Sequence, residues 1–190
     1  DKAFSYIKQE LEKAGLNPYV QTLEWDSVLL ERSQQEGATI QSEAIKEDEN
    51  VKEGVLVDNT TYLIGKAKNI YCIIRGNDSK LKDEYIFIRA NYGGNGVDTI
   101  KKNEIIKNSA NDNASGVASL IEIAKKLKAN ETLLKRSVVI VFTGDYNTDI
   151  ARDYFLRHFK EVANQNNAKI RLGFYLSCLG TIEKQDTSNT

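Results

Sequence analysis

The chain has 190 residues, the length of one ordinary globular domain, and its 26 Lys and Arg residues nearly balance its 27 Asp and Glu residues. This balance argues against a nucleic-acid-binding protein, because contact with phosphates normally requires a basic excess. No apolar run reaches the roughly 18 residues that a membrane-spanning helix needs. The single histidine excludes a metal site built from several imidazoles.

The cysteines and the first residue leave two questions open. Cys72 and Cys178 do not make a disulfide framework, and whether they pair depends on a proximity that sequence cannot show. The sequence begins at Asp1 and has no signal-peptide pattern, so we expect a processed form or a domain taken from a longer chain.

The first quarter of the chain predicts one helix and one strand. Apolar residues recur at three- and four-residue steps over residues 3–15, which is typical of an amphipathic helix, and Gly15 ends the pattern. Residues 19–25 alternate like a half-buried strand. Residues 33–53 are polar and rich in Gln and Glu, and we expect a solvated surface excursion there.

The rest of the chain predicts strands that later alternate with helices. A hairpin is expected from strands at 55–57 and 62–64 joined by a turn at 58–61. Nearly continuous apolar runs, typical of strands buried on both faces, follow at 69–74, 85–90, 136–142 and 170–176. Helices are expected at 114–129 and 149–163, the second carrying His158 on its surface. This alternation predicts an α/β domain with parallel pairing and helices on both faces of the sheet.

Polar segments follow several of these strands, where open α/β sheets bind their ligands. They begin at Asn91, at Thr143 and at Ser177, and a further polar segment, Asn111-Asp-Asn-Ala-Ser-Gly116, leads into the helix at 114–129. Asn and Asp before a helix commonly act as N-caps, which is the structural role expected for Asp112. Its alternative role is that of a metal ligand.

The segment Asn111–Gly116 and the Val-Ala-Ser-Leu-Ile-Glu-Ile-Ala after it resemble the signature of the di-zinc aminopeptidases. That family includes bacterial leucyl aminopeptidases, glutaminyl cyclases and the protease-like domain of the transferrin receptor. The order and spacing of elements match it from about residue 3 to residue 180. The resemblance implies a three-layer αβα fold with a mostly parallel mixed sheet, lacking the family's final strands. We expect one domain, 1–190, in which 181–190 is a polar tail.

The resemblance also locates the family's site, residue by residue. The bridging carboxylate is retained as Asp112, and the family's general base, a Glu, corresponds to Asp145. The other positions are degenerate. The metal-binding His corresponds to Asn91 and its orienting Asp to Gly93. The second Glu of the family's Thr-Gly-Glu-Glu motif, a metal ligand, corresponds to Tyr146, and the Asp of its Asn-x-Asp motif corresponds to Ser177. The last His ligand would lie beyond residue 190.

These substitutions predict that the two zinc ions of the family are absent, since a catalytic zinc needs about three His, Asp or Glu ligands and an open position. We therefore expect no cofactor and an inactive peptidase-like domain, retained as a binding or scaffold module for an unidentified protein or peptide. The alternative is a metal-dependent aminopeptidase with a site rebuilt around Asp112 and Asp145. A third possibility is that the chain is a fragment. The resemblance favours an extracytoplasmic or secreted location.

Overall fold

The computed structural model describes residues 2–30, 56–57, 60–94, 97–98, 105–106, 109–144 and 150–180. The elements, in chain order, are α1 (Lys2–Lys13), β1 (Tyr19–Leu30), β2 (Leu56–Val57), β3 (Thr60–Ile74), β4 (Glu84–Asn91), β5 (Val97–Asp98), β6 (Ile105–Ile106), η1 (Ala110–Ser115), α2 (Gly116–Ala129), η2 (Glu131–Leu133), β7 (Ser137–Thr143), α3 (Ile150–Arg157), α4 (Phe159–Ala163) and β8 (Lys169–Tyr175). Here η1 is a distorted turn of π-helix and η2 a turn of 3-10 helix.

The chain divides into two compact units, one of residues 1–21 with 68–190 and one of residues 22–67. In the smaller unit, β2 pairs antiparallel with the start of β3, which confirms the expected hairpin. The register Val57↔Thr60 places Thr60 and Thr61 in the strand and leaves two residues between the paired positions. The polar segment 33–53 lies outside the described residues, and the single-domain organisation stays a prediction.

The main sheet is mixed and has the strand order β1-β3-β7-β4-β8. The larger unit contains β7, β4 and β8 in full, with residues 19–21 of β1 and 68–74 of β3. β3 and β7 are antiparallel, whereas β4 is parallel to both of its neighbours, β7 and β8. Every residue of β7 is buried, as expected for a central strand that has a neighbour on each side. The mixed α/β sheet is therefore confirmed, and its parallel part consists of β7, β4 and β8.

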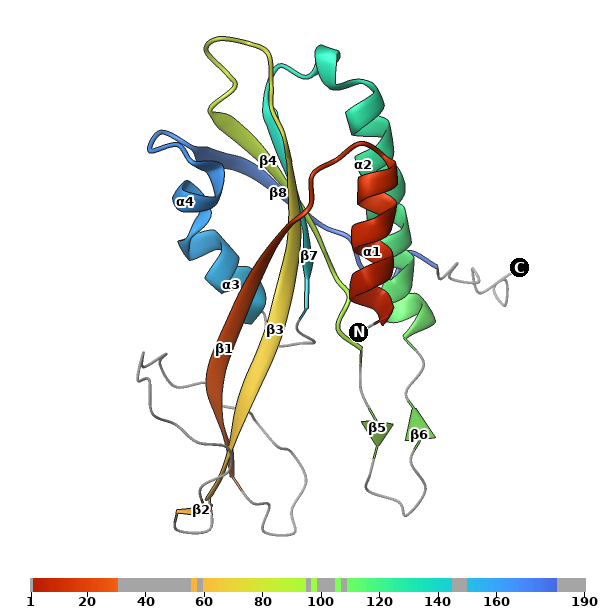
Figure 1. Cartoon of the computed structure of the whole chain (residues 1–190), viewed down its shortest axis with the longest axis vertical. Helices are drawn as coiled ribbons and strands as arrows, with labels where there is room; N and C mark the ends of the chain where they lie inside the picture. The colour runs from red at the N-terminus through yellow and green to blue at the C-terminus, as the bar shows by residue number, and fades with distance from the viewer. Residues whose placement is uncertain are drawn as a thin grey trace, which may run out of the picture. The chain divides into compact units, whose positions relative to one another are not determined.

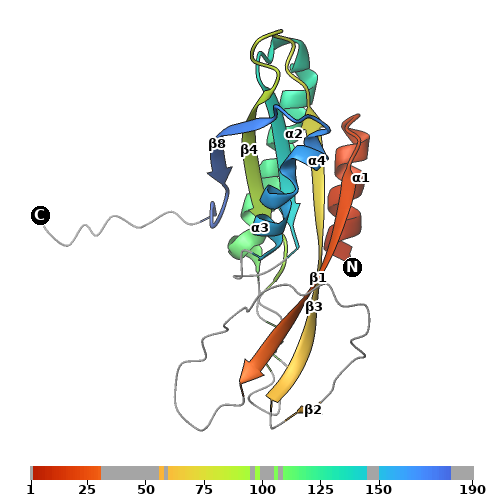
Figure 2. The ribbon, with the colours of Figure 1, turned by 90° about the vertical axis from the view of Figure 1, so that its left-hand side faces the viewer.

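Helices cover both faces of this sheet, as predicted (Figure 1). α1 and α2 pack on one face around a cluster that includes Leu11, Leu120 and Ile140, and α3 and α4 pack on the other around Phe155 and Tyr85. Figure 2 views the sheet from the side of α3 and α4, and it shows β8 at the sheet margin. No helix among the described residues is long and apolar enough to cross a membrane.

Three expectations about these elements were wrong. The strands expected at 62–64 and 69–74 are one strand, β3, because the residues between them continue the extended backbone. The helix expected at 149–163 is two helices, α3 and α4, separated at His158. The imidazole of His158 is half-buried, and its Nδ1 lies 2.8 Å from the Tyr154 carbonyl oxygen. The same oxygen accepts a hydrogen bond from the His158 backbone N–H.

The third wrong expectation concerns β8, which was expected to be buried on both faces. Six of its seven residues are exposed. The physical reason is its place in the sheet: α2 packs on β4 and β7, and no described strand lies beyond β8.

Candidate functional site

Three segments far apart in sequence meet at the carboxyl end of the parallel strands. β4 ends at Asn91, β8 is followed by Leu176, and η1 carries Asn113. The Asn113 amide, 2% exposed, joins them, since its Nδ2 donates to Asn91 Oδ1 at 2.8 Å and to the Leu176 carbonyl at 2.8 Å. The meeting of strand ends with the segment before α2 is what the sequence predicted.

Asn91 is held from a second side by Tyr175. The phenol donates to Asn91 Oδ1 at 2.8 Å, while Asn91 itself is 4% exposed. The parallel register of β4 and β8 pairs Tyr175 with Arg89, whose guanidinium lies 4.0 Å from the centre of the Tyr175 ring, within cation–π distance. Asn91, Asn113, Tyr175 and the Leu176 carbonyl form one neutral hydrogen-bonded cluster, called here the corner.

The segment before α2 also holds the turn after β8. Asn111 Oδ1 accepts a hydrogen bond from the Gly180 N–H at 2.8 Å. Ser115 Oγ donates to the Asn111 carbonyl at 2.7 Å and accepts from the Leu179 N–H at 3.0 Å. These bonds give the polar residues of the motif a structural task that needs no metal.

Gly116, which ends this motif, fits tightly between its neighbours. A Cβ at that position would lie 2.4 Å from both the Leu176 carbonyl oxygen and Asn113 Oδ1. Only a residue without a side chain allows the helix start to approach the corner this closely.

The structure brings together some of the sequence-predicted site residues. Asn91 lies in the corner, and Asp112 precedes Asn113 in η1. Gly93 is half-buried in the loop after β4, and Ser177 follows Leu176, with its Oγ 3.5 Å from Cys178 Sγ. The positions Asp145 and Tyr146 lie outside the described residues, so their roles stay predictions.

The capping role expected for Asp112 was wrong. α2 begins at Gly116 with Ser115 as its N-cap, so Asp112 lies three residues before the cap. Its backbone dihedral angles, φ −113° and ψ 86°, are not helical. The motif enters the helix through an irregular turn, which a one-dimensional capping rule does not anticipate.

The donor set of the corner does not fit a zinc ion. Asn91 Oδ1 already accepts two hydrogen bonds, and an amide oxygen is a poor zinc ligand compared with imidazole or carboxylate. Within the described part of the chain, no three His, Cys, Asp or Glu side chains lie close enough together to hold a metal. We therefore derive no chemistry through zinc from these residues.

Polar side chains continue from the corner across the sheet. Thr143 on β7 pairs with Asn91 on β4. Asn69 on β3 and Thr143 on β7 both lie one residue beyond the pair Ile70↔Phe142, which ends the β3–β7 register. Asn69 Nδ2 donates to Gln21 Oε1 at 3.0 Å and to the Ala151 carbonyl at 2.8 Å. Asn69 Oδ1 and Thr143 Oγ1 are buried and have no hydrogen-bond partner in the described structure. Buried polar atoms without a hydrogen bond are unfavourable in a core. Here they lie at the end of the sheet that also carries Asn91, where polar side chains replace the apolar ones of the core.

Two further titratable side chains, Tyr92 after β4 and Cys72 on β3, are protonated at ordinary pH. Burial raises the pKa of the Tyr92 phenol to about 12, and its hydroxyl donates to the Lys68 carbonyl at 2.6 Å, so it is neutral at ordinary pH. Burial likewise raises the pKa of the Cys72 thiol to about 12, which makes a thiolate nucleophile unfavourable. Cys72 is buried, Cys178 is exposed, and they form no disulfide with each other.

Sequence reasoning missed the central parts played by Asn113 and Tyr175. Asn113 was interpreted as shaping a loop, although its place inside the motif was a usable signal. Tyr175 gave no signal, because its contact with Asn91 depends on the pairing of β4 with β8, which no local pattern encodes.

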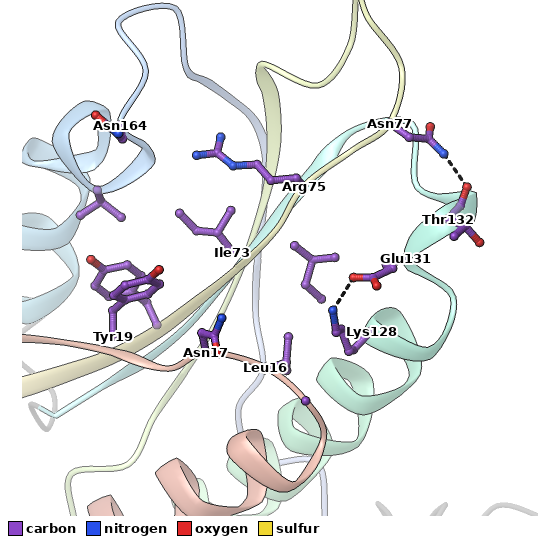
Figure 3. A pocket seen from close by; sticks show the side chains of 14 residues that line it. Leu16, Asn17, Tyr19, Ile73, Arg75, Asn77, Lys128, Glu131, Thr132 and Asn164 are labelled. Carbon is purple, nitrogen blue, oxygen red and sulfur yellow. Dashed lines mark hydrogen bonds and ion pairs between the residues drawn. The ribbon is translucent and has the colours of Figure 1, made fainter.

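One pocket borders the corner and another lies at the opposite end of the sheet. The first, about 400 Å³, has a mostly apolar lining supplied by Ala3, Tyr6, Ile7, Tyr92, Ser109, Asn113, Ala114, Val117 and Ala118. The second, about 800 Å³, lies where β3 meets the start of β7 (Figure 3). Its lining includes Tyr19 stacked on Tyr71 and the ion pair of Lys128 with Glu131, but none of the predicted site residues.

Comparison with known proteins finds a family that the chain matches. Residues 69–185 match the sequence pattern of peptidase family M28. None of the curated protein sequences compared with the chain matches it.

Solved structures share the fold. A glutaminyl cyclase from Bacteroides thetaiotaomicron has a TM-score of 0.56 at 19% identity, covering 95% of this chain and 54% of that one. A leucine aminopeptidase precursor from the same organism gives 0.54 at 18%, with the same coverages. BSAP, a zinc aminopeptidase from Bacillus subtilis, gives 0.53 at 13%, covering 95% of this chain and 63% of that one. The chain thus spans a little over half the length of the first two, and the likeness at these identities concerns the fold.

Proposed function

The chain belongs to peptidase family M28, and from that premise we propose that it is a member without peptidase activity that acts as a binding or scaffold module. The observation that carries the proposal is the corner. There Asn91, which the resemblance matches to the family's metal-binding His, accepts hydrogen bonds at its Oδ1 from Asn113 and Tyr175.

The chemistry of this cluster favours structure over catalysis. A catalytic zinc site keeps ligands that bind the ion and an open position for water. Each partner of Asn91 Oδ1 is instead a neutral donor at 2.8 Å, and Asn113 is itself buried. A cation at Asn91 Oδ1 would have to displace two hydrogen bonds, one of them from the buried Asn113 amide, which is unfavourable.

The binding part of the proposal rests on the pocket of about 400 Å³ beside the corner. Its lining includes the buried side chains Ile7 and Asn113 and the exposed Tyr6. A concave, mostly apolar surface next to one buried amide suits an apolar side chain of a peptide or protein partner. This use of the family fold needs no reaction.

The proposal is tested by peptidase activity and by metal content. The purified chain, dialysed against excess zinc and then against buffer, is expected to retain well below one equivalent of zinc by elemental analysis. It is expected to show no zinc-dependent hydrolysis of aminoacyl anilides. Asp112→Ala should change neither result, and Asp153→Ala, at a carboxylate on α3, is the matched control.

Tightly held zinc, with turnover that Asp112→Ala abolishes and Asp153→Ala preserves, would refute the proposal. It would favour the alternative, an aminopeptidase rebuilt around Asp112 and Asp145. A site of oxygen ligands alone would prefer Mg²⁺ or Ca²⁺ to zinc. In that case either ion should raise the melting temperature of the unaltered chain and should leave that of Asp112→Asn unchanged. An extracytoplasmic location also stays a proposal.

A further inference from the structure

The pocket of about 800 Å³ is a groove across the margin of the sheet at β3, with α4 on one side of it and the end of α2 on the other (Figure 3). A volume of this size suits a ligand. The groove borders the start of β7, because Ile74 at the end of β3 pairs with Val138. Residue 180 follows the carboxyl end of β8, at the opposite end of the parallel strands, and β7 and β4 lie between β3 and β8. The groove is therefore remote from the margin at β8.

The backbone of β3 turns hydrogen-bonding groups toward this groove. The Thr143 carbonyl of β7 accepts a hydrogen bond from the Tyr92 N–H, so every second residue of β7, counted back from Thr143, faces β4. The residues between them, including Val138, face β3 and bond to their register partners, such as Ile74. Because the direction alternates along a strand, the backbone N–H and C=O of Ile73 point to the other side of β3, where β1 lies.

The contacts between β1 and β3 define their register. Tyr19 stacks on Tyr71 with 5.4 Å between the ring centres, and Asn69 Nδ2 donates to Gln21 Oε1 at 3.0 Å. A step of two residues forward on β1 thus matches a step of two residues back on β3, which is the register of an antiparallel pair.

In this register β1 begins too late to bond with Ile73. The position opposite Ile73 is that of Asn17, which precedes the first residue of β1, Tyr19. Among the described residues, no backbone hydrogen bond joins Asn17 to Ile73, and both residues line the groove. The N–H and C=O of Ile73 are therefore open to an incoming strand.

Beside this edge, Arg75 carries a positive charge that has no carboxylate partner within the described ranges. Its Nη2 donates to the Ala163 carbonyl at 2.6 Å, and its Nη1 donates to the Tyr85 phenol. Both acceptors are neutral, and a guanidinium has more N–H donors than these two acceptors use. Its side chain extends from β3 toward the α4 side of the groove (Figure 3), where a carboxylate is the group that it binds best.

We propose that the groove binds an extended peptide segment of a partner protein, which adds to β3 in line with β1 and places an acidic side chain at Arg75. Such strand addition gains affinity from backbone hydrogen bonds and specificity from alternate side chains. The inference goes beyond the proposed function, because it concerns a second site at the other end of the sheet and does not depend on the absence of peptidase activity.

The register specifies which side chains the peptide should carry. Residues opposite each other in an antiparallel pair share a face of the sheet, and Arg75 and Ile73 both face α4. The peptide residue opposite Arg75 should be acidic. The residue opposite Ile73 comes two positions later and should be apolar, because Ile73 and Val162 supply half-buried apolar side chains there. The expected pattern, read from the amino end, is acidic, any residue, apolar.

Short peptides test this pattern on the unaltered chain. A peptide with Glu-Thr-Val at its centre, acetylated and amidated at its ends, is titrated into the isotope-labelled chain, and the backbone amide signals are followed by NMR. We expect saturable shifts at residues 15–19 and 71–77, which surround the groove. A Gln-Thr-Val peptide should bind about tenfold more weakly, because it loses a charge-assisted hydrogen bond, and a Lys-Thr-Val peptide should bind more weakly still.

N-methylated peptides test the strand pairing itself. In the proposed register the N–H of the peptide's Val donates to the Ile73 carbonyl, whereas the N–H of its Thr points away from β3. Methylation of the Val nitrogen should weaken binding about tenfold, and methylation of the Thr nitrogen, the matched control, should have little effect.

Charge variants of the chain then test the role of Arg75. Arg75→Gln should weaken the Glu-Thr-Val peptide about tenfold, whereas Arg157→Gln, at an exposed position on α3 outside the groove, removes the same charge and should not. Arg75→Glu should reverse the preference, so that Lys-Thr-Val binds more tightly than Glu-Thr-Val. Circular dichroism checks that these variants fold, since Arg75 also holds the Ala163 carbonyl, and the peptide series needs no variant.

Several results would overturn the proposal. These are the absence of saturable shifts around the groove with Glu-Thr-Val at several millimolar, equal binding of the two methylated peptides, and a charge preference that Arg75→Glu leaves unchanged. Acetate that produced the same shifts at the same affinity would also overturn it, because the groove would then take a free carboxylate and not an added strand.

Discussion

Removing the Asn113 amide is the perturbation that most directly tests the corner. Asn113→Ala deletes the donor that reaches Asn91 Oδ1 and the Leu176 carbonyl, and the acceptor used by the Cys178 N–H at 3.3 Å. Asn91 keeps its hydrogen bond from Tyr175, but the Leu176 carbonyl and the Cys178 N–H lose this side-chain partner.

The expected loss follows from these bonds. Each hydrogen bond contributes about 0.5–1.5 kcal/mol net, and a buried polar group left without a partner costs about 1–3 kcal/mol. With two short bonds and one longer bond removed at a side chain that is 2% exposed, we expect a loss of roughly 2–4 kcal/mol. That is a large share of the about 5–15 kcal/mol by which domains are stable.

Urea unfolding followed by circular dichroism measures this loss as a change of midpoint at unchanged slope. The matched control is Asn130→Ala, since the exposed Asn130 amide donates one bond, to the Lys126 carbonyl at 2.9 Å. We expect that control to lose less than about 0.5 kcal/mol.

Asn113→Asp sharpens the test, because it keeps the shape but places a carboxylate oxygen against two acceptors. It should destabilise at neutral pH at least as much as Asn113→Ala. If Asn113→Ala and Asn130→Ala shifted the midpoint equally, the corner would not hold these segments together, and the support for the proposed function would fall.

Three further predictions concern Gly116, Tyr175 and Cys72. Gly116→Ala should cost about 2 kcal/mol or more in urea unfolding, because its Cβ would lie 2.4 Å from the Leu176 carbonyl oxygen, whereas Gly173→Ala should be nearly neutral. Tyr175→Phe should cost about 1 kcal/mol by the same assay, since it removes one hydrogen bond and keeps the ring; a loss near zero would show that Asn91 does not need the phenol. The stability of the chain should fall as pH rises above about 9, because the unfolded Cys72 thiol ionises there while burial raises its folded pKa to about 12. The contribution is roughly 1.4 kcal/mol per pH unit, and a Cys72→Ala variant whose alkaline slope matched that of the unaltered chain would contradict it.

Much of the fold was readable from local pattern. The apolar spacing of residues 3–15 predicted α1, and two apolar runs predicted β4 and β7. Such elements are predictable because the order of apolar and polar residues along the chain reflects which side chains are buried. The motif at Asn111–Gly116 indicated the family, which residues 69–185 confirm. The position of Asn91 at the end of β4 also followed from the sequence.

What the tertiary structure decided is whatever depends on neighbours distant in sequence. Tyr175 reaches Asn91 because β8 lies parallel to β4 in one register, and no local pattern encodes a pairing between residues 84 positions apart. The apolar run of β8 resembles a central strand, yet it is exposed, because burial requires a neighbour and the described sheet ends there. By itself the sequence determined which side chains stand at the strand ends. Only the folded chain decided that they form hydrogen bonds with one another, because those bonds depend on the register of distant strands.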